Sequence, residues 1–163
     1  SRLQGSDRIT PDQKVEIREI LEHVIRLMEG QARINDNELQ FRMEETEAFV
    51  SGDEDQLIQV FQNLIENAIK YGRVGEAVEI DVSQSGSRYI TIMVSDHGEG
   101  IAQADIPRLT ERFYRVDKGR SRDQGGTGLG LAIVKHIVKR HRGQLNIISK
   151  PGEGSSFSVI LPI

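Results

Sequence analysis

The sequence predicts an α+β fold: a two-layer α/β sandwich whose mixed, mostly antiparallel sheet carries helices on one face. Two observations predict it. Three segments repeat apolar residues at helical spacing, and the segments between them alternate apolar and polar residues as strands do. Four of the predicted strands form two hairpins, so most neighbouring strands are expected to pair antiparallel.

Length and composition fit one domain with a hydrophobic core. The chain has 163 residues, of which 37% are hydrophobic and 28% charged. No signal peptide is recognisable, and no apolar run approaches the roughly 20 residues that span a bilayer. Cysteine is absent, which excludes disulfides and thiolate metal sites. The net charge of −4 and the lack of Trp argue against a general nucleic-acid binder.

The first third of the chain predicts a linker, a helix and two strands. Residues 1–14 are polar and are expected to be a linker. A helix is predicted to end near Gly30, and its apolar face is Ile17, Ile20, Leu21, Val24 and Met28. Alternating apolar residues over 39–43 predict a strand, and a short strand is expected around 49–50.

A second helix is predicted to run to about Tyr71. Asp53 is its expected N-cap, with Gln56 as capping-box partner. Its apolar stripe consists of Leu57, Val60, Phe61, Leu64, Ile65 and Ala68. Two strands follow, at 77–84 and 89–96, and the Ser-Gly-Ser turn between them indicates a hairpin.

Residues 97–127 show only a short helical signal, within 104–113. An irregular stretch of this length is usually functional. A third helix is predicted over 129–141, and strands over 144–149 and 156–162 close the chain as a second hairpin.

The second helix carries an unusual polar face. Asn63 and Asn67 lie one turn apart and Lys70 follows them, although Asn is a mediocre helix former. Amide oxygens can ligate Mg²⁺, and Lys can meet phosphate. Tyr71 can offer its ring to a purine. The alternative is an ordinary solvated face.

The segment "DHGEG" follows a strand predicted to be buried. Asp96, at the end of that strand, has the chemistry to accept a hydrogen bond from an exocyclic amino group such as that of adenine. The spacing of Gly98 and Gly100 superficially suggests a dinucleotide-binding turn. That interpretation is rejected, because residue 103 is Gln and no parallel strand-helix-strand unit surrounds the motif. A simple turn is the alternative.

A glycine-rich stretch, "GGTGLGLA", opens the third helix. Its backbone N–H groups have the chemistry of a phosphate cradle, and a flexible loop is the alternative. No Gly-Lys-Ser/Thr follows, so it is not a Walker motif. Before it lies a basic cluster, for which both a mobile lid over phosphates and a solvated loop are open interpretations: Arg112, Arg115, Lys118, Arg120 and Arg122.

Taken in order, four motifs resemble the N, G1, F and G2 boxes of sensor histidine kinases. They are "NLIENAIKYG", "DHGEGI", "ERFYRVD" and "GGTGLGLAIVKHI". The resemblance covers roughly 15–163 and implies the catalytic ATP-binding domain of these kinases, of the GHKL (Bergerat) fold. The stretch "FYRVDKGRSRDQGGTGLGLAIVKHI" is similar to that of phosphate-sensing PhoR-type kinases.

The resemblance implies ATP and Mg²⁺ as cofactors and assigns a role to each motif residue. Asn63 and Asn67 hold Mg²⁺, Asp96 binds the adenine amino group, and Asn63 and Arg115 are the catalytic pair. The implied nucleotide-binding residues are Asn67, Lys70, Tyr71, Asp96, Gly98, Gly100, Gly126, Thr127, Gly128, Leu129 and Gly130.

The same resemblance implies transfer of the ATP γ-phosphoryl group to a His on a dimerisation domain. No H-box stands in this chain, so the acceptor is expected elsewhere and residues 1–14 can be the end of the missing hairpin. Hydrolysing members carry Glu where this chain has Asn63, so efficient ATP hydrolysis is not expected. The implied location is cytoplasmic without direct membrane contact, in a full-length protein that can be anchored in the inner membrane, with a response regulator as partner.

Two other functions fit the same boxes. One is a degenerate GHKL module that binds ATP only as a regulatory signal, and the other is a GHKL kinase that phosphorylates protein serine. His23 is followed by Val24, where an H-box has an acidic residue. None of the four histidines is predicted to be the acceptor: His23, His97, His136 and His141.

Overall fold

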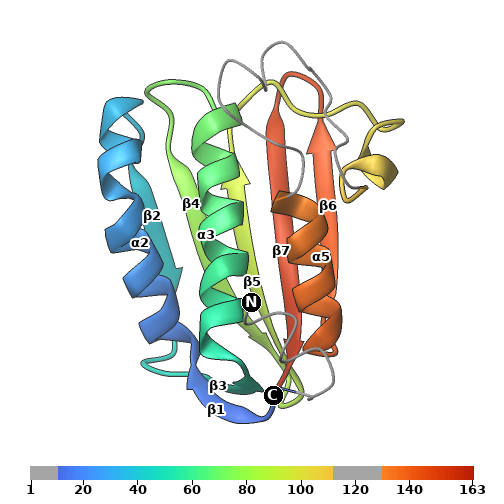
Figure 1. Ribbon diagram of the computed structural model, residues 1–163. Helices are drawn as coiled ribbons and strands as arrows, with labels where there is room; N and C mark the ends of the chain where they lie inside the picture. The colour runs from blue at the N-terminus through green and yellow to red at the C-terminus, as the bar shows by residue number, and fades with distance from the viewer. Residues whose placement is uncertain (1–10, 112–129) are drawn as a thin grey trace.

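The computed structural model describes residues 11–111 and 130–163 (Figure 1). In chain order its elements are β1 (Gln13–Glu16), α2 (Ile17–Ile34), β2 (Leu39–Met43), β3 (Phe49–Gly52), α3 (Glu54–Tyr71), β4 (Val78–Ser85), β5 (Tyr89–Asp96), η1 (Ile106–Arg108), α5 (Gly130–Arg140), β6 (Gln144–Lys150) and β7 (Gly154–Pro162). In these two ranges no helix combines the length and the apolar character that crossing a bilayer requires.

The predicted α+β sandwich is confirmed. Within the described residues, five strands form one mixed sheet in the order β2-β4-β5-β7-β6, in which only β2 and β4 pair in parallel. The helices α2, α3 and α5 all cover the same face of that sheet (Figure 1). Both predicted hairpins are present, as β4–β5 and β6–β7.

The core lies between this sheet and the helices. All six residues of the apolar stripe predicted for α3 are buried, and Ile69 joins them. Asp53 is the N-cap of α3, where its Oδ1 accepts from the N–H of Gln56 at 3.0 Å. On β5 the buried residues alternate, so that Ile90, Ile92 and Val94 face the helices.

One strand is absent from the predictions. β1 begins at Gln13, in the segment expected to be a linker, and pairs antiparallel with β3 as a separate two-stranded sheet. Val15 and Val50 lie opposite each other in this pair, and both are buried. Only one of the four residues of β1 is apolar, so its sequence carries no alternation to recognise.

The prediction that the first helix ends near Gly30 is wrong. α2 continues to Ile34 and buries Ala32, two residues beyond the glycine. Gly30 is exposed, and a glycine inside a helix costs only about 1 kcal/mol relative to Ala. Burial of Ala32 therefore decides the end of the helix, and the chain turns at Asp36, whose φ is +55°.

His141 fastens the end of α5 to the start of α3. The residue is 3% exposed. Nε2 accepts from the N–H of Asp53 at 3.0 Å, and Nδ1 donates to the carbonyl of Ile137 at 2.8 Å. An acceptor at Nε2 requires the neutral ring, and burial lowers the pKa of His141 below its ordinary value of 6.5.

Stability is therefore expected to fall as the pH drops below about 6.5. In that range the unfolded chain binds a proton at His141 that the folded chain rejects. Urea unfolding at about pH 5.5 and pH 7.5 measures the effect. His141→Leu should lower the free energy of unfolding at pH 7.5 by about 1–3 kcal/mol, because it orphans the N–H of Asp53.

His23→Gln is the matched control, because His23 is exposed on α2. It should keep the pH slope of the wild-type protein, whereas His141→Leu should flatten it. An unchanged slope in His141→Leu would show that other groups carry the pH dependence.

Candidate functional site

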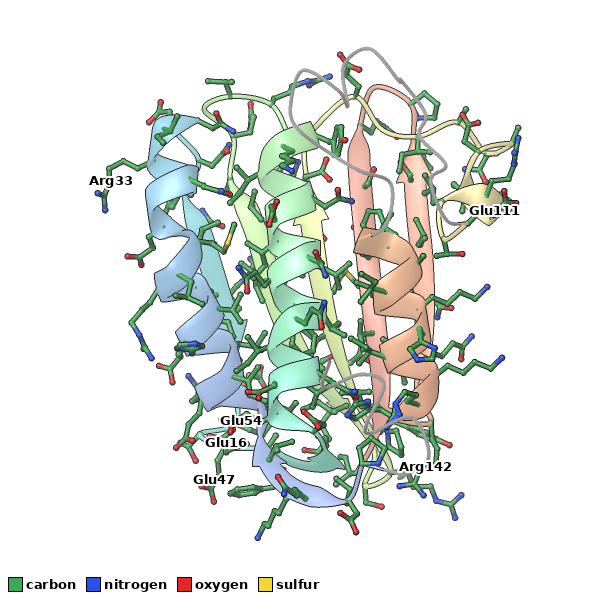
Figure 2. The ribbon with its side chains drawn as sticks, in the orientation of Figure 1. Glu16, Arg33, Glu47, Glu54, Glu111 and Arg142 are labelled. Atoms are coloured by element: carbon green, nitrogen blue, oxygen red, sulfur yellow. The ribbon has the colours of Figure 1, made fainter. Side chains whose placement is uncertain are left out.

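The N and G1 motifs, together with the described part of the G2 motif, meet at the end of the molecule where α3 and β5 finish (Figure 1). α5 begins there, and the turn between β6 and β7 closes that end of the sheet. Figure 2 shows Glu111, at the end of the described loop, far from Glu16, Glu47 and Glu54, which mark the end of the molecule that carries the small sheet. The end of α3, the turn after β5 and the start of α5 therefore lie at the same end of the molecule, opposite the small sheet.

The polar face predicted on α3 is present. Asn63, Asn67 and Lys70 are all half-buried on the same helix, whereas the apolar stripe faces the core. Lys70 Nζ lies 3.0 Å from an oxygen of Glu66, one turn earlier. The lysine expected to meet phosphate thus has a carboxylate partner in Glu66, and a phosphate group would compete with Glu66 for it.

The start of α5 lies against this face. A Cβ atom built on Gly130 would stand 3.4 Å from Oδ1 of Asn63. The first residue of the third helix therefore approaches the N-box asparagine closely. The other predicted residues of the F and G2 boxes lie outside the described residues: Arg115, Gly126, Thr127, Gly128 and Leu129.

Asp96 ends β5 as a buried carboxylate. The residue is 8% exposed, and its Oδ1 accepts from the N–H of Gly98 at 2.8 Å. Burial raises the pKa of Asp96 above its ordinary value, and hydrogen bonds from the backbone N–H groups of Gly98 and Ser155 oppose the rise. Gly72 is so close that a Cβ added to it would stand 3.4 Å from the Cβ of Asp96. The carboxylate therefore sits beside the C-terminal end of α3.

Two glycines allow the turn after Asp96 to pack closely. A Cβ on Gly98 would overlap the carbonyl oxygen of Tyr71, and one on Gly100 would overlap that of Lys150. Gly100 also has a φ of +77°, which disfavours other residues. The turn thus lies between the end of α3 and the turn that joins β6 to β7.

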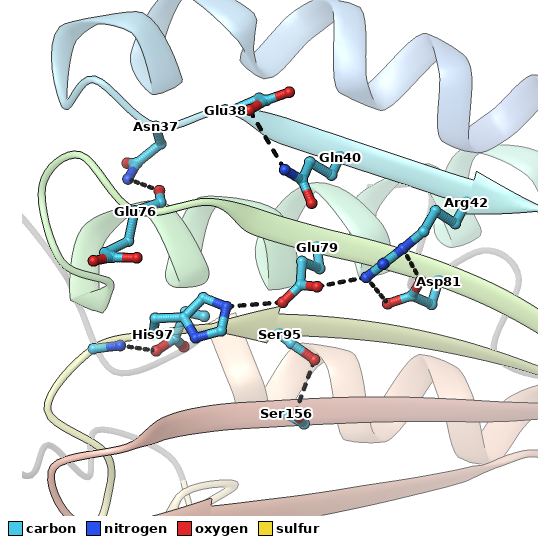
Figure 3. Close-up of polar contacts among 12 residues, drawn as sticks. Asn37, Glu38, Gln40, Arg42, Glu76, Glu79, Asp81, Ser95, His97 and Ser156 are labelled. Atoms are coloured by element: carbon cyan, nitrogen blue, oxygen red, sulfur yellow. Dashed lines mark hydrogen bonds and ion pairs between the residues drawn. The ribbon is translucent and has the colours of Figure 1, made fainter.

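A charged network runs from this turn across the sheet face that carries no described helix (Figure 3). Nε2 of His97 lies 2.8 Å from Glu79, and Arg42 bridges Glu79 to Asp81 with a bond of 2.7 Å to the latter. The hydrogen bond from His97 is the main cause that lowers the pKa of Glu79. Sequence reasoning missed this network, because it depends on the register of Arg42 opposite Asp81.

Ser149 was also missed. It is 3% exposed and joins the turn after Asp96 to the turn between β6 and β7. A signal was available in β6, where Leu145, Ile147 and Ser149 alternate on one face. A serine that continues an apolar alternation is a candidate buried polar group that needs partners.

The arrangement suits a purine nucleotide with a metal ion. Asp96 offers a buried acceptor to a base, and Lys70 offers a cation to phosphate. Within 11–111 and 130–163, no group of three or more His, Asp or Glu residues can hold a metal. Asn63 and Asn67 are half-buried amides one turn apart, which fit a Mg²⁺ ion that keeps water and phosphate oxygens as its other ligands.

In comparison with known proteins, the family model described as histidine kinase-, DNA gyrase B-, and HSP90-like ATPase matches residues 52–163. A similar relative is the sensor-like histidine kinase SenX3 of Mycolicibacterium smegmatis. It is 40% identical over 163 residues, which cover 99% of this chain and 42% of the relative. The chain thus spans less than half the length of this curated relative.

Solved structures of similar fold carry related descriptions. A mycobacterial sensor histidine kinase, MprB, aligns with a TM-score of 0.78 and 28% identity, covering 93% of this chain and 97% of that one. The full-length structure of ShkA in complex with AMPPNP aligns with a TM-score of 0.80 and 26% identity, over 93% of this chain and 31% of that one.

Proposed function

The chain belongs to the family of histidine kinase-, DNA gyrase B-, and HSP90-like ATPases, and from this premise we propose that it is the catalytic ATP-binding domain of a two-component sensor histidine kinase. In this proposal the domain, over 15–163, presents ATP to a histidine on a dimerisation domain outside the chain. The γ-phosphorus then exchanges its bond to the bridging oxygen of ADP for a bond to the imidazole nitrogen, and ADP leaves.

One observation carries the proposal: a buried carboxylate, at Asp96, lies beside the end of the helix that bears Asn63, Asn67 and Lys70. Such a carboxylate can accept from the adenine amino group while the helix face receives the phosphates. Tyr71 ends that helix, next to Gly98, where its ring can pack on the base. AMPPNP, the ligand named in the ShkA structure, is an ATP analogue, which supports the same ligand class.

Mg²⁺ is part of the proposal. Asn63 and Asn67 would hold it, since the described residues offer amide oxygens there rather than a carboxylate cluster. When bound, the ion neutralises phosphate charge and orients the polyphosphate. Arg115, the remaining proposed catalytic residue, and the cradle residues Gly126, Thr127, Gly128 and Leu129 lie outside the described residues, and their roles stay predictions.

Transfer to histidine is favoured over hydrolysis by the chemistry of Asn63. A neutral amide does not accept a proton near neutral pH, so Asn63 cannot act as the base that activates water. It can only position groups. We therefore expect the acceptor to be an external nucleophile brought to the γ-phosphate.

The acceptor is proposed to lie outside this chain. Both ring nitrogens of His141 are engaged in the core, and His97 is paired with Glu79. The relatives described above are sensor kinases, which favours neither a purely regulatory ATP-binding module nor a serine kinase. A response regulator that receives the phosphoryl group from the histidine, and a cytoplasmic location, complete the proposal.

The decisive experiment supplies the missing acceptor. The domain is mixed with γ-labelled ATP, Mg²⁺ and the separately purified dimerisation hairpin of the same full-length protein. Acid-labile, base-stable label on the hairpin is expected, because a phosphoramidate hydrolyses in acid.

A hairpin with its histidine changed to glutamine is the control and should stay unlabelled. Label on the hairpin that resists acid would indicate a hydroxyl acceptor and favour the serine-kinase alternative. No label, with ATP binding intact, would favour the regulatory module.

A further inference from the structure

We propose that Ser149 is a positioning residue of the purine site, which holds the turn that follows Asp96 against the turn between β6 and β7. Its hydroxyl accepts from the N–H of Ile101 at 2.7 Å and donates to the carbonyl of Gly154 at 2.9 Å. A third contact joins it to the hydroxyl of Ser155 at 2.8 Å. One side chain thus connects two turns that are about fifty residues apart in sequence.

The hydroxyl of Ser149 is saturated. A serine hydroxyl has one hydrogen to donate and two lone pairs that accept. Since its hydrogen goes to the carbonyl of Gly154, the hydroxyl of Ser155 must donate to it, as does the N–H of Ile101. All three capacities are used in a site that is 3% exposed. Removal of the hydroxyl would leave a half-buried N–H and a buried carbonyl without this partner.

Both turns that Ser149 joins also hold Asp96. On one side, Gly98 donates its N–H to the carboxylate of Asp96, three residues before Ile101. On the other side, the backbone N–H of Ser155 also stabilises that carboxylate. Gly154 packs so closely on the carbonyl of Asp96 that it has no room for a Cβ. The Ser149 hydroxyl therefore fixes the spacing of the two backbone donors that aim the carboxylate.

Gln103 adds a second link between the same turns. Its Nε2 donates to the backbone carbonyl of Ser149 at 2.8 Å. Its side chain is exposed, so its loss should not disturb the core. The link from Gln103 is expected to contribute less than the buried hydroxyl.

This role rests on the proposed function, because it presumes that Asp96 binds the purine amino group. A displaced carboxylate should then weaken nucleotides that have this amino group and spare those that lack it. ATP and ITP differ there, since the inosine base carries a carbonyl in place of the amino group. A purely structural serine would lower affinity for both nucleotides together.

The test measures the affinities of ATP and ITP for the whole domain by calorimetry, for the wild type, Ser149→Ala and Ser95→Ala. Ser95→Ala is the matched control. Ser95 shares a hydroxyl–hydroxyl hydrogen bond of 2.8 Å with Ser156, precedes Asp96, and lies on the opposite sheet face (Figure 3).

Ser149→Ala should weaken ATP about tenfold and ITP by less than about twofold. Ser95→Ala should keep the wild-type ratio of ATP affinity to ITP affinity. Ser149→Thr, which keeps the hydroxyl, should also show the wild-type ratio. Equal losses for the two nucleotides in Ser149→Ala, or the same change of ratio in Ser95→Ala, would overturn the positioning role.

Two further variants keep the test decisive. If Ser149→Ala does not fold, Ser149→Cys carries the test, because its thiol keeps the size of the side chain but is only a weak donor and acceptor. A ratio that stays at the wild-type value in that folded variant overturns the proposal. Asp96→Asn separates the two levels. A normal ATP affinity in Asp96→Asn removes the proposed purine site itself, whereas a loss in Asp96→Asn with a normal ratio in Ser149→Ala removes only the role of Ser149.

Discussion

Asn67→Ala is expected to abolish Mg-ATP binding while the domain stays folded. The side chain of Asn67 is half-buried on the polar face of α3, and the residues that fasten this helix to the sheet lie on its other face. Alanine is the better helix former by about 0.5 kcal/mol, so thermal stability should not fall. Loss of a proposed Mg²⁺ ligand should raise the dissociation constant at least about 100-fold, or about 2.8 kcal/mol.

Calorimetry with ATP in the presence of Mg²⁺ is the measurement, with thermal unfolding alongside it. Gln59→Ala is the matched control, because it removes an amide two turns before Asn67 on the same side of α3. That variant should bind as the wild type does. An Asn67→Ala protein with unchanged affinity would refute the Mg²⁺ assignment, and an equal loss measured in EDTA would assign Asn67 to the nucleotide rather than to the ion.

Most of α3 could be predicted because its signals are local. The capping box expected from Gln56 is wrong, because the N–H of Asp53 donates to Nε2 of His141 instead. A capping residue, an unbroken apolar stripe and a polar second face stand within one run of sequence, and the structure confirms the cap and the stripe. α2, which continues past its predicted end near Gly30, shows the limit of such local signals. Gly30 locally favours a helix end, but burial of Ala32 against the rest of the protein outweighs that preference.

In the candidate site, too, the local features could be predicted from the sequence and the contacts between distant segments could not. The i,i+4 spacing of Asn63 and Asn67 places both on one helix face without any tertiary information. By contrast, Ser149 contacts Ile101 only because the end of β6 lies beside the turn that follows β5. His97 contacts Glu79 only because β4 pairs with β5. A motif search cannot detect contacts that depend on strand register, even though each residue involved can be read in the sequence.

Asp96→Asn is expected to weaken ATP and ADP alike, by about 10- to 100-fold, which is the usual worth of a hydrogen bond to a charged group. Two backbone donors, the N–H groups of Gly98 and Ser155, stabilise this carboxylate. Asparagine has only one side-chain oxygen, which these donors would hold, so its NH₂ group would be left to face the adenine amino group. Two donors then meet where a donor and an acceptor are required.

The pH dependence of binding tests the same assignment. Burial raises the pKa of Asp96, so the free protein takes up a proton there at a higher pH than an ordinary aspartic acid does. Because the ionised form is the acceptor for the base, ATP and ADP affinity should fall together on acidification, and Asp96→Asn should remove that fall. Asp81→Asn, which deletes a carboxylate paired with Arg42 on the other sheet face, should behave as the wild type. A variant Asp96→Asn that loses ATP but keeps ADP would place the carboxylate near the γ-phosphate rather than the base.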